Sequence, residues 1–218
     1  MKMMKKRNFK YLLVLLFIVI ALTISGCTAD TTIDVTYSSG LRSDKIADGD
    51  SLTVAQFADN TRETGIAGAK NRAGNVGMTY TSTTPIGELV RNTLAEQLEK
   101  RGFEVDTMGL WDLNPENINQ IKTDLVAGGE IKAFWAENRP GSGQYRIGGT
   151  GFGEVSLYIV VVKPDTGEQV WIGEITGGTT QQNLIGSPEL EEMLNKAFSE
   201  AIDNLLTSSD FIEAITNN

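Results

Sequence analysis

A single cysteine, Cys27, constrains this chain more than any other residue. Without a second thiol, no intramolecular disulfide can form, so packing and hydrogen bonds alone must hold the fold together. The cysteine follows a basic head, Met1 to Lys10, and an apolar run from Tyr11 to Ser25. The run falls short of the roughly 20 apolar residues of a membrane-spanning helix. A basic head, a short apolar run and small residues before a cut site predict a signal peptide over residues 1–26.

The segment Leu22 to Cys27, LTISGC, resembles the lipobox of bacterial lipoproteins. The resemblance implies that the Cys27 thiol receives a diacylglyceryl group and that the chain is cut just before it. The alternative is an uncleaved signal anchor with an incidental cysteine. Thr28 follows the cysteine where Asp would otherwise signal retention, so in a two-membrane bacterium we expect sorting to the outer membrane, facing the periplasm. We expect residues 27–31 to form the lipidated tether and residues 32–218 one globular domain.

The charge of the mature chain excludes one class of partner. The whole chain has 19 basic and 28 acidic residues, and five basic residues precede Cys27, which leaves a net charge of −14 after cleavage. Nucleic-acid binding depends largely on Lys and Arg contacts to phosphate, so we predict no nucleic-acid partner. Anionic headgroups should also repel the domain, so the lipid on Cys27 must supply the membrane attachment, and stable anchoring requires two or more acyl chains.

Hydrophobic periodicity predicts strands separated by three helices. The predicted strands are Ile33–Tyr37, Leu52–Phe57, Phe103–Met108, Ile131–Glu137, Gln144–Lys163 and Glu168–Thr176, with a turn over Pro164–Gly167. Thr84-Pro85, Asn114-Pro115 and Ser187-Pro188 each pair an N-cap residue with a proline, which is typical of a helix start. The second helix would bury Ile118, Ile121, Leu125 and Val126, and the third a broad stripe from Leu190 to Leu206. We predict an α/β (α+β) single-domain sandwich of about three helices on a mixed sheet.

No motif in the chain names a reaction. The chain has no histidine, which removes the commonest general base and metal ligand, and the expected modification commits Cys27. GIAGAK from Gly65 and GGTGFG from Gly148 match neither phosphate-binding glycine pattern. We therefore predict no catalytic residue, no metal site and no cofactor, although the many carboxylates leave a catalytic pair open. Of the three tryptophans, we expect at least two in the core and one lining a surface groove.

Asp59–Thr83 is the least regular stretch. It is rich in Gly, Asn and Thr and shows little periodicity, and long loops of this kind are usually functional or disordered. It also gathers Arg62, Lys70 and Arg72 on an acidic domain. We predict that Asp59, Arg62, Lys70 and Arg72 take part in binding an anionic partner, such as an acidic protein face or a glycan. The alternative is a spacer whose cations balance nearby acids.

Leu52 to Val105 resembles the YajG family of bacterial envelope lipoproteins. The features that carry the resemblance are LTVAQFADNTRE, a polar loop, and TPIGELVRNTLAEQLEKRGFEV. The resemblance implies an outer-membrane lipoprotein with helices on a sheet and no established biochemical activity.

Three functions remain open. The first is a non-enzymatic envelope lipoprotein that binds an envelope protein or glycan. The second is a subunit of an oligomeric secretion or appendage complex, which requires a long hairpin with an apolar outward face. The third is a carboxylate-dependent hydrolase, which requires a cleft holding two carboxylates with raised pKa values.

Overall fold

The computed structural model describes residues 31–38, 44–62, 65–70, 76–140, 149–184 and 187–217. By its internal contacts the chain divides into Met1–Asp30 and Thr31–Asn218, and every described residue belongs to the second unit. The strands are β1 (Thr31–Ile33), β2 (Ser51–Gln56), β3 (Ala58–Asp59), β4 (Ala67–Lys70), β5 (Val76–Ser82), β6 (Glu104–Leu110), β7 (Leu125–Pro140), β8 (Gly149–Val162) and β9 (Gln169–Leu184). The helices are α2 (Ile86–Lys100), the 3₁₀ turn η1 (Pro115–Ile118), α3 (Ser187–Thr207) and α4 (Ser209–Thr216). Three α-helices on a mixed sheet confirm the predicted α+β class.

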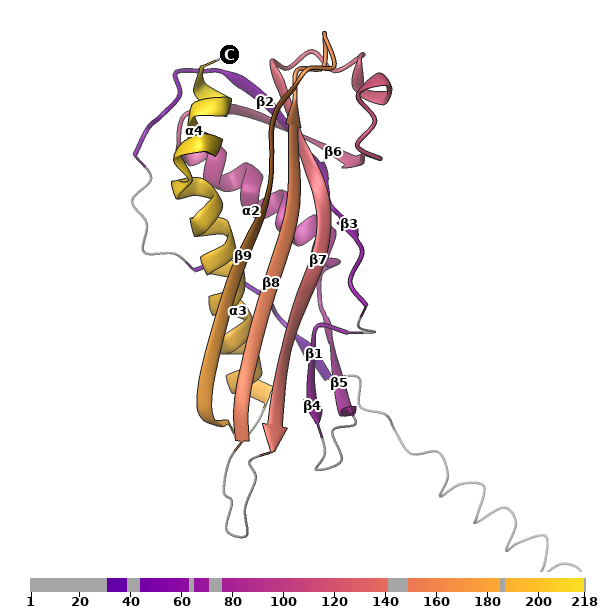
Figure 1. The fold of residues 1–218 in the computed structure, drawn as a ribbon, viewed down its shortest axis with the longest axis vertical. Coiled ribbons are helices and arrows are strands. Elements are labelled where there is room, and N and C mark those ends of the chain that lie inside the picture. Colours follow the sequence, from indigo (N-terminus) through magenta and orange to yellow (C-terminus); the bar gives the residue numbers. More distant parts are fainter. Residues whose placement is uncertain are drawn as a thin grey trace, which may run out of the picture. The chain divides into compact units, whose positions relative to one another are not determined.

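Strand β7 is the centre of the sheet (Figure 1). One of its edges pairs in succession with β2, β3 and β4, all parallel. Its other edge pairs with β8, and β8 with β9, both antiparallel. Outside this centre β6 pairs with β2, β5 with β4, and β1 with β5. The β7–β8–β9 meander, with strands of 16, 14 and 16 residues, therefore forms the longest part of the sheet.

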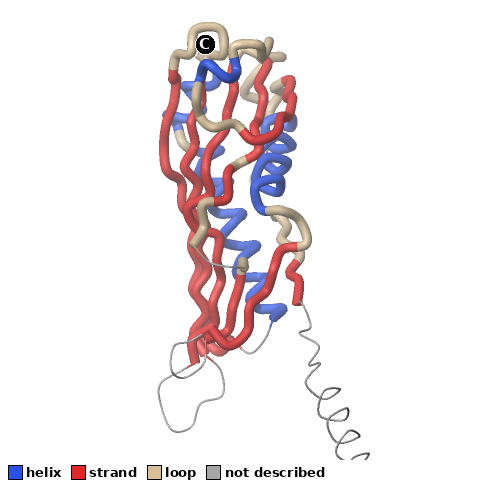
Figure 2. Tube along the Cα trace, turned by 90° about the vertical axis from the view of Figure 1, so that its right-hand side faces the viewer, coloured by secondary structure: helices blue, strands red, loops and turns tan. Residues whose placement is uncertain are grey.

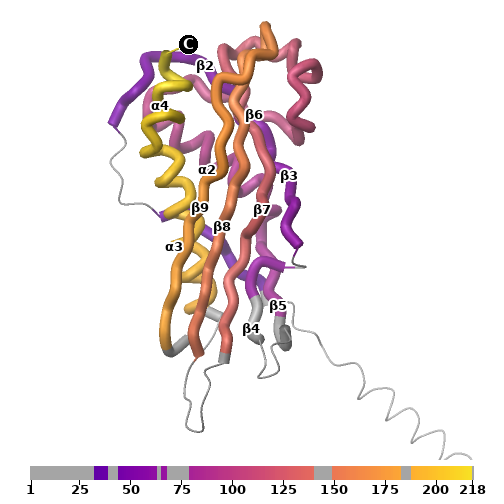
Figure 3. Tube along the Cα trace, viewed as in Figure 1, coloured from indigo at the N-terminus to yellow at the C-terminus, as the bar shows by residue number. Residues whose placement is uncertain are grey.

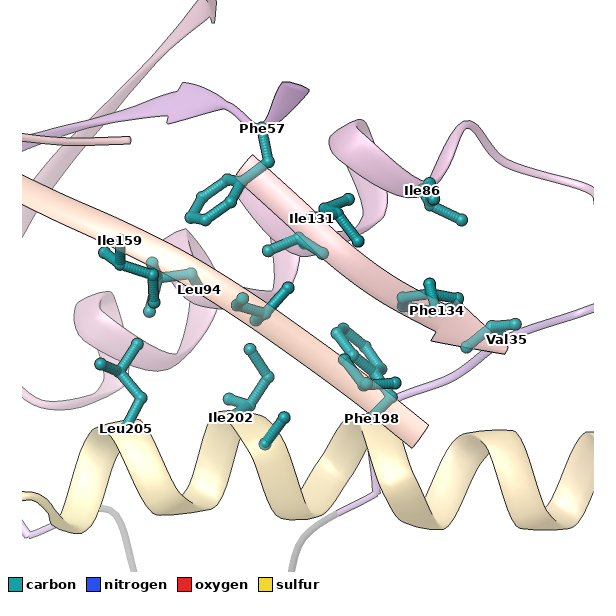
Figure 4. Close-up of a cluster of buried hydrophobic side chains, with 14 of the residues drawn as sticks. Val35, Phe57, Ile86, Leu94, Ile131, Phe134, Ile159, Phe198, Ile202 and Leu205 are labelled. Carbon is teal, nitrogen blue, oxygen red and sulfur yellow. The ribbon is translucent and has the colours of Figure 1, made fainter. Parts of the chain in front are cut away.

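Helices α2 and α3 lie on one side of the meander (Figure 2). Phe198, Ile202 and Leu205 of α3 point at the strands that carry Phe134 and Ile159 (Figure 4). The rings of Phe134 and Phe198 lie 5.7 Å apart between centroids. The stripe predicted for the third helix is confirmed, since Leu190, Met193, Leu194, Ala197, Phe198, Ala201, Ile202, Leu205 and Leu206 are all buried. After α3 the chain continues into a further helix, α4, which begins after the Ser208 N-cap. Helix α4 lies at the end of the sheet where β2 begins (Figure 3).

A glycine lets α3 approach β9 at backbone distance. A Cβ atom on Gly177 would collide with the carbonyl oxygen of Ala197 and the amide nitrogen of Ala201, both in α3. At the neighbouring Gly178 the only nearby atom is 3.7 Å from a Cβ position, which is ordinary contact. Gly178 also donates its backbone N–H to Glu200 Oε2 at 2.8 Å, so α3 partly satisfies the outer edge of β9.

Helix α2 connects the parallel strands β2 and β6. It ends at Arg101, a buried side chain whose Nη1 donates to the carbonyl oxygen of Leu206 at 2.7 Å. The last carbonyls of a helix have no partner within the helix, so Arg101 satisfies one of those of α3. The Arg-Gly-aromatic pattern at the end of α2 therefore connects two helices.

A second, smaller core lies on the other side of the sheet. Trp111 packs there against Ala55, Val126 and Val160, together with η1. Its indole N–H donates to the carbonyl of Asn114 at 2.8 Å. This segment therefore covers one part of the face opposite α2 and α3.

The predicted second helix is wrong. Asn114-Pro115 starts only the single turn η1, and Leu125 and Val126 begin β7. Both residues are buried because Leu125 faces the main core and Val126 the second core. A strand buried on both faces has consecutive apolar residues, so Ile118, Ile121, Leu125 and Val126 matched a helical spacing by coincidence.

The prediction of an irregular loop over Asp59–Thr83 is also wrong. This stretch contains the end of β3 and all of β4 and β5, which join the sheet between β7 and β1. Tyr80 of β5 and Ala67 of β4 are buried in the main core. Pairing with β7 supplies the order that the composition of the segment does not show.

Of the predicted strand Ile33–Tyr37 only Ile33 belongs to β1, because the backbone N–H groups of Thr36 and Ser38 donate to side chains of α3 instead of to a strand. The remaining strand predictions are confirmed, with changed ends. Val155, Leu157, Ile159 and Val161 of β8 share the buried face, as their alternation predicts. The turn after them is closed by Lys163 and Glu168, and Gly167 has a φ of 71°, which favours glycine. Strand β7 begins earlier, and β9 ends later, than periodicity predicts.

Candidate functional site

The structure separates the residues predicted to bind a partner. Cys27 and Arg72 lie outside the described residues. Asp59 ends β3 and pairs with Ile131 of β7, whereas Lys70 follows Ala69, which pairs with Asn138. Asp59 and Lys70 are therefore about eight residues apart along β7, or roughly 26 Å. They belong to one segment but not to one site.

Asp59 organises a turn. Its Oδ1 accepts hydrogen bonds from the backbone N–H and the hydroxyl of Thr61, at 3.1 and 2.7 Å. Arg62 follows and is exposed. Asp59 and Thr61 also line a hollow of about 210 Å³ beside Thr84 and Pro85, at the start of α2. An Asp that bonds its own turn is the structural role expected of this residue type.

A surface that sequence reasoning did not single out lies on the meander, on the side away from α2 and α3. We call it the open face. Within the described residues, no helix covers this face between the second core and the end of β7 (Figures 1 and 2). Its members alternate with the buried residues of β7, β8 and β9. They are Glu130, Lys132, Trp135, Glu137, Arg139, Thr150, Phe152, Glu154, Tyr158, Thr180 and Gln182.

Glu137 is the unusual residue of the open face because its side chain is only 5% exposed. Its carboxylate pairs with Arg139 Nε and accepts a hydrogen bond from Trp135 Nε1 at 3.3 Å. The Arg139 guanidinium also lies 4.7 Å from the ring centroid of Phe152, which pairs with Glu137 across the strands. A buried carboxylate needs such partners, because an unpaired buried charge costs several kcal/mol. The four side chains therefore hold one another in place.

A second cation–aromatic pair lies further along the same face. Lys132 pairs with Glu130, and its Nζ lies 5.3 Å from the centroid of Tyr158. The hydrogen bond from Lys132 lowers the pKa of Glu130, and a bond from Asn60 adds to the effect against the opposing effect of burial. Beside this pair, Ser156 Oγ donates to Glu174 at 2.7 Å. The open face thus carries three aromatic rings, each held beside charged groups.

The expected core packing of two tryptophans is confirmed, whereas a groove at the third stays a prediction. Trp111 is buried in the second core, and Trp171 packs edge-on against Phe211 with centroids 5.1 Å apart. Trp135 is the one at the surface. The signal that could have found the open face was the alternation of Lys132, Trp135, Glu137 and Arg139 with buried residues, since a strand with charge and aromatic rings on one face exposes that face.

The alternative functions require features that can be compared with the described residues. Among them, no three Asp, Glu, Cys or His side chains lie close enough to hold a metal ion. Their clear pKa shifts are all downward, at Asp48, Asp124 and Glu130, with hydrogen bonds from Lys45, Ser51 and Lys132 as the largest causes. These three carboxylates lie apart from one another along the chain and do not form the carboxylate pair that the hydrolase requires.

The secretion-subunit alternative requires an apolar outward face on a long hairpin. The described part of the β7–β8 hairpin instead carries Glu130, Lys132, Glu137, Arg139 and Glu154 on its outward face. Nor does any described helix combine the length and apolarity needed to cross a membrane.

Solved structures of other bacterial proteins share the fold of this chain. Family models and curated proteins give no match to this sequence. Among solved structures, the chain is similar to a Xanthomonas campestris protein of the DUF330 family, with 13% identity over 86% of this chain and 96% of that one, at a TM-score of 0.53. A homologue of a neuraminyllactose-binding hemagglutinin from Helicobacter pylori has 10% identity over 84% and 97%, at 0.51. A hypothetical protein from Chlamydia trachomatis has 8% identity over 79% and 100%, at 0.50. At these identities the likeness establishes a shared fold.

Proposed function

We propose that this chain is a lipoprotein of the bacterial envelope, related to the YajG family, and that it acts by binding rather than by catalysis. The signal peptide and the lipobox at Cys27 support the anchor. The chain has no histidine, which removes the commonest general base, and this favours a binding role over catalysis. In a two-membrane bacterium, Thr28 after the cysteine favours the outer membrane and its periplasmic side.

We propose the open face as the binding surface, with a protein as the partner. The observation that carries this proposal is the group Trp135, Glu137, Arg139 and Phe152, held together by mutual contacts on a sheet face that no helix covers within the described part of the chain. Aromatic side chains and Arg dominate the energy of protein interfaces, and little conformational entropy is lost when they are already fixed. The face is about three strands wide and ten residues long, or roughly 450 Å². An interface of that size is typical of weak, reversible complexes.

The cations of the Asp59–Thr83 segment remain a separate proposal. Arg62, Lys70 and Arg72 would meet an anionic partner, as their positive charge on an acidic domain suggests. Arg62 and Lys70 lie near distant parts of β7. The anionic partner would therefore contact the domain at two separate places, one near each of these residues. A glycan is the alternative partner, and the name of the Helicobacter pylori neighbour mentions a sugar ligand.

The anchor is tested by replacing the lipidated residue. Cys27→Ala should remain uncleaved and unlipidated, and should leave the membrane fraction on washing without detergent. A variant that still sediments with membranes after washing would favour an uncleaved signal anchor.

The open face is tested by photo-crosslinking in living cells from position 180. Thr180 is exposed on β9 and pairs with Phe152. A protein adduct that disappears on adding Phe152→Ser, while the melting temperature is kept, would support the proposal. Leu110→Ser is the matched control, because Leu110 is 64% exposed on β6, outside the open face. A glycan adduct would contradict the protein partner, and no adduct would contradict the surface.

A further inference from the structure

Helix α3 bonds to the outer edge of β9 through two polar side chains one turn apart. Glu200 accepts a hydrogen bond from the backbone N–H of Gly178 at 2.8 Å, and Asn204 Nδ2 donates to the carbonyl oxygen of Thr176 at 2.9 Å. Backbone groups that are bonded in this way are not available to an added strand, so this part of the edge is protected.

The same helix bonds to the segment that follows β1. Asn195 Oδ1 and Ser199 Oγ, also one turn apart, accept hydrogen bonds from the N–H groups of Thr36 and Ser38 at 3.0 and 2.9 Å. Polar side chains on two flanks of α3 therefore occupy backbone groups at two edges of the sheet.

Strand β6 is a third edge, and it is more open. It ends the strand order, and among the described strands its partner is β2. Five of its seven residues are exposed, whereas none of the six in β2 is. The described side chains give its backbone one hydrogen bond, from Arg91 of α2 to the carbonyl oxygen of Met108 at 3.4 Å. A Cβ atom on Gly109 would meet no atom within 4 Å, so the space beside this end of the strand is free.

One hydrogen bond shows which backbone groups of β6 face outward. Glu104 donates its N–H to the carbonyl oxygen of Asp50, just before β2, at 3.0 Å. In a parallel pair the N–H and C=O of one residue face the partner strand, and those of the next residue face away. The register with β2 is regular over the first five residues of β6. The N–H and C=O groups of Val105 and Thr107 therefore face outward, whereas Met108 belongs to the inward set.

The sequence of β6, EVDTMGL, is complementary to itself in antiparallel order about its central residue, Thr107. With Thr107 opposite its own copy, the facing pairs are Asp106 with Met108, Val105 with Gly109, and Glu104 with Leu110. Each acid then faces an uncharged residue, and the branched valine faces a glycine with free space beside it. Like charges directly opposite each other destabilise a strand pair, and this arrangement has none.

The two acids of β6 select this register. Acidic residues on an edge usually discourage pairing with another chain. Moving the centre of the pairing from Thr107 to Asp106 places Asp106 opposite its own copy, and moving it to Val105 places Asp106 opposite Glu104. Moving the centre toward Leu110 avoids both repulsions but shortens the paired stretch. The register centred on Thr107 is thus the one that uses the whole strand without opposing two acids.

We propose that β6 is the contact between two copies of this chain, paired antiparallel with Thr107 on the twofold axis. The occupant is a second copy because the edge matches itself in hydrogen-bonding groups, in charge and in side-chain size. Such a contact uses the same residues on both subunits and closes at two copies. Strand β2 lies between β6 and β7, so the dimer leaves the open face free for its partner. A contact of one short strand is small, and small interfaces form weak, reversible complexes.

A weak dimer is best trapped with a disulfide, in the full chain and in membranes isolated from cells that produce it. Opposite residues of a hydrogen-bonded antiparallel pair have Cα atoms about 5.5 Å apart, which a disulfide can span. Under mild oxidation Thr107→Cys should therefore give a linked dimer on non-reducing gels. Val105→Cys is the matched control, because its two copies would lie about 14 Å apart along the strand, too far for a bridge. The wild type, whose one thiol is Cys27, is the blank.

The second arm tests the register. Val105→Cys and Gly109→Cys combined in one chain should restore the dimer that Val105→Cys alone lacks, because these positions face each other. Gly109 accepts a side chain, since it has no positive φ and no close neighbour. Adding Thr107→Pro removes an N–H that faces outward, and proline is tolerated on an edge strand in this orientation. This addition should abolish the dimer and leave the melting temperature nearly unchanged.

Three results would overturn the inference. The first is no dimer from Thr107→Cys, or as much dimer from Val105→Cys alone, which would indicate random collision. The second is an adduct of position 107 with a different protein, which would assign the edge to another partner. The third is a dimer of the double-cysteine chain that survives Thr107→Pro.

Discussion

Two neighbouring glycines in β9 allow the packing of α3 to be tested by matched substitutions. A methyl group on Gly177 would meet two backbone atoms of α3, at Ala197 and Ala201, whereas one on Gly178 meets only ordinary contact. Backbone atoms cannot rotate aside, so Gly177→Ala must move α3 away from β9 by about 1 Å. A gap of that size loses a quarter to a half of the dispersion energy of each contact across it.

Overpacking of this kind typically costs about 1–3 kcal/mol. The substitution also stiffens the unfolded chain, which returns about 0.4–1 kcal/mol. Gly177→Ala should therefore destabilise the domain by about 1–2 kcal/mol. Gly178→Ala should be neutral, or stabilising by at most about 1 kcal/mol, because only the unfolded-state term applies. For a domain of this size, 1 kcal/mol shifts the melting temperature by about 2–4 °C.

The assay is urea unfolding of residues 28–218, followed by circular dichroism and tryptophan fluorescence, with the midpoint and the slope fitted separately. A lower midpoint with an unchanged slope for Gly177→Ala, and a wild-type midpoint for Gly178→Ala, would support the close approach of α3. Equal midpoints for the two variants would refute the described contact between β9 and α3.

Three further predictions concern other parts of the domain. Phe198→Asp should prevent cooperative unfolding of residues 28–218, because it buries an unpaired charge against Phe134, whereas Lys196→Asp on the exposed side of α3 should cost at most about 1 kcal/mol. Ser51 lowers the pKa of Asp124, so Ser51→Ala should lower stability at neutral pH, and this difference should fade as the pH falls below 3.8, as unfolding midpoints measured across pH would detect. Replacing Arg62, Lys70 and Arg72 together with Ala should leave the melting temperature nearly unchanged but weaken the crosslinks between the protein and its partner. High salt should have the same effect on the crosslinks of the wild type. A triple variant that fully complements a deletion would show these cations to be dispensable.

The sequence predicted the parts of the fold in which one face is apolar and the other polar. Val155, Leu157 and Ile159 alternate with Ser156 and Tyr158, so their common face could be assigned without a structure. The stripe of α3 was equally clear, because Phe198, Ala201 and Ile202 repeat at helical spacing. Where each residue contacts only one core, periodicity is a sufficient guide.

The sequence failed where a strand contacts two cores or depends on its neighbours. Leu125 and Val126 are buried on opposite faces of β7, which erases the alternation of a strand. Strand β4, with the sequence AGAK, has no strong preference of its own and is ordered by pairing with β5 and β7. The spacing of Trp135, Glu137 and Arg139 can be read from the sequence. Their contact with Phe152 cannot, because it depends on the register of β7 and β8.

The central position of β7 has a consequence for the order in which the chain can fold. Strands β2, β3 and β4 all precede α2 in sequence. Each pairs with the same edge of β7, and β7 ends only at Pro140. A chain emerging N-terminus first therefore exposes these strands until its central part has followed. The β2–α2–β6 unit can pair earlier, since β6 ends at Leu110. The edges of β2, β3 and β4 that face β7 therefore stay unpaired until β7 arrives, and the arrival of that one strand joins the earlier strands into one sheet.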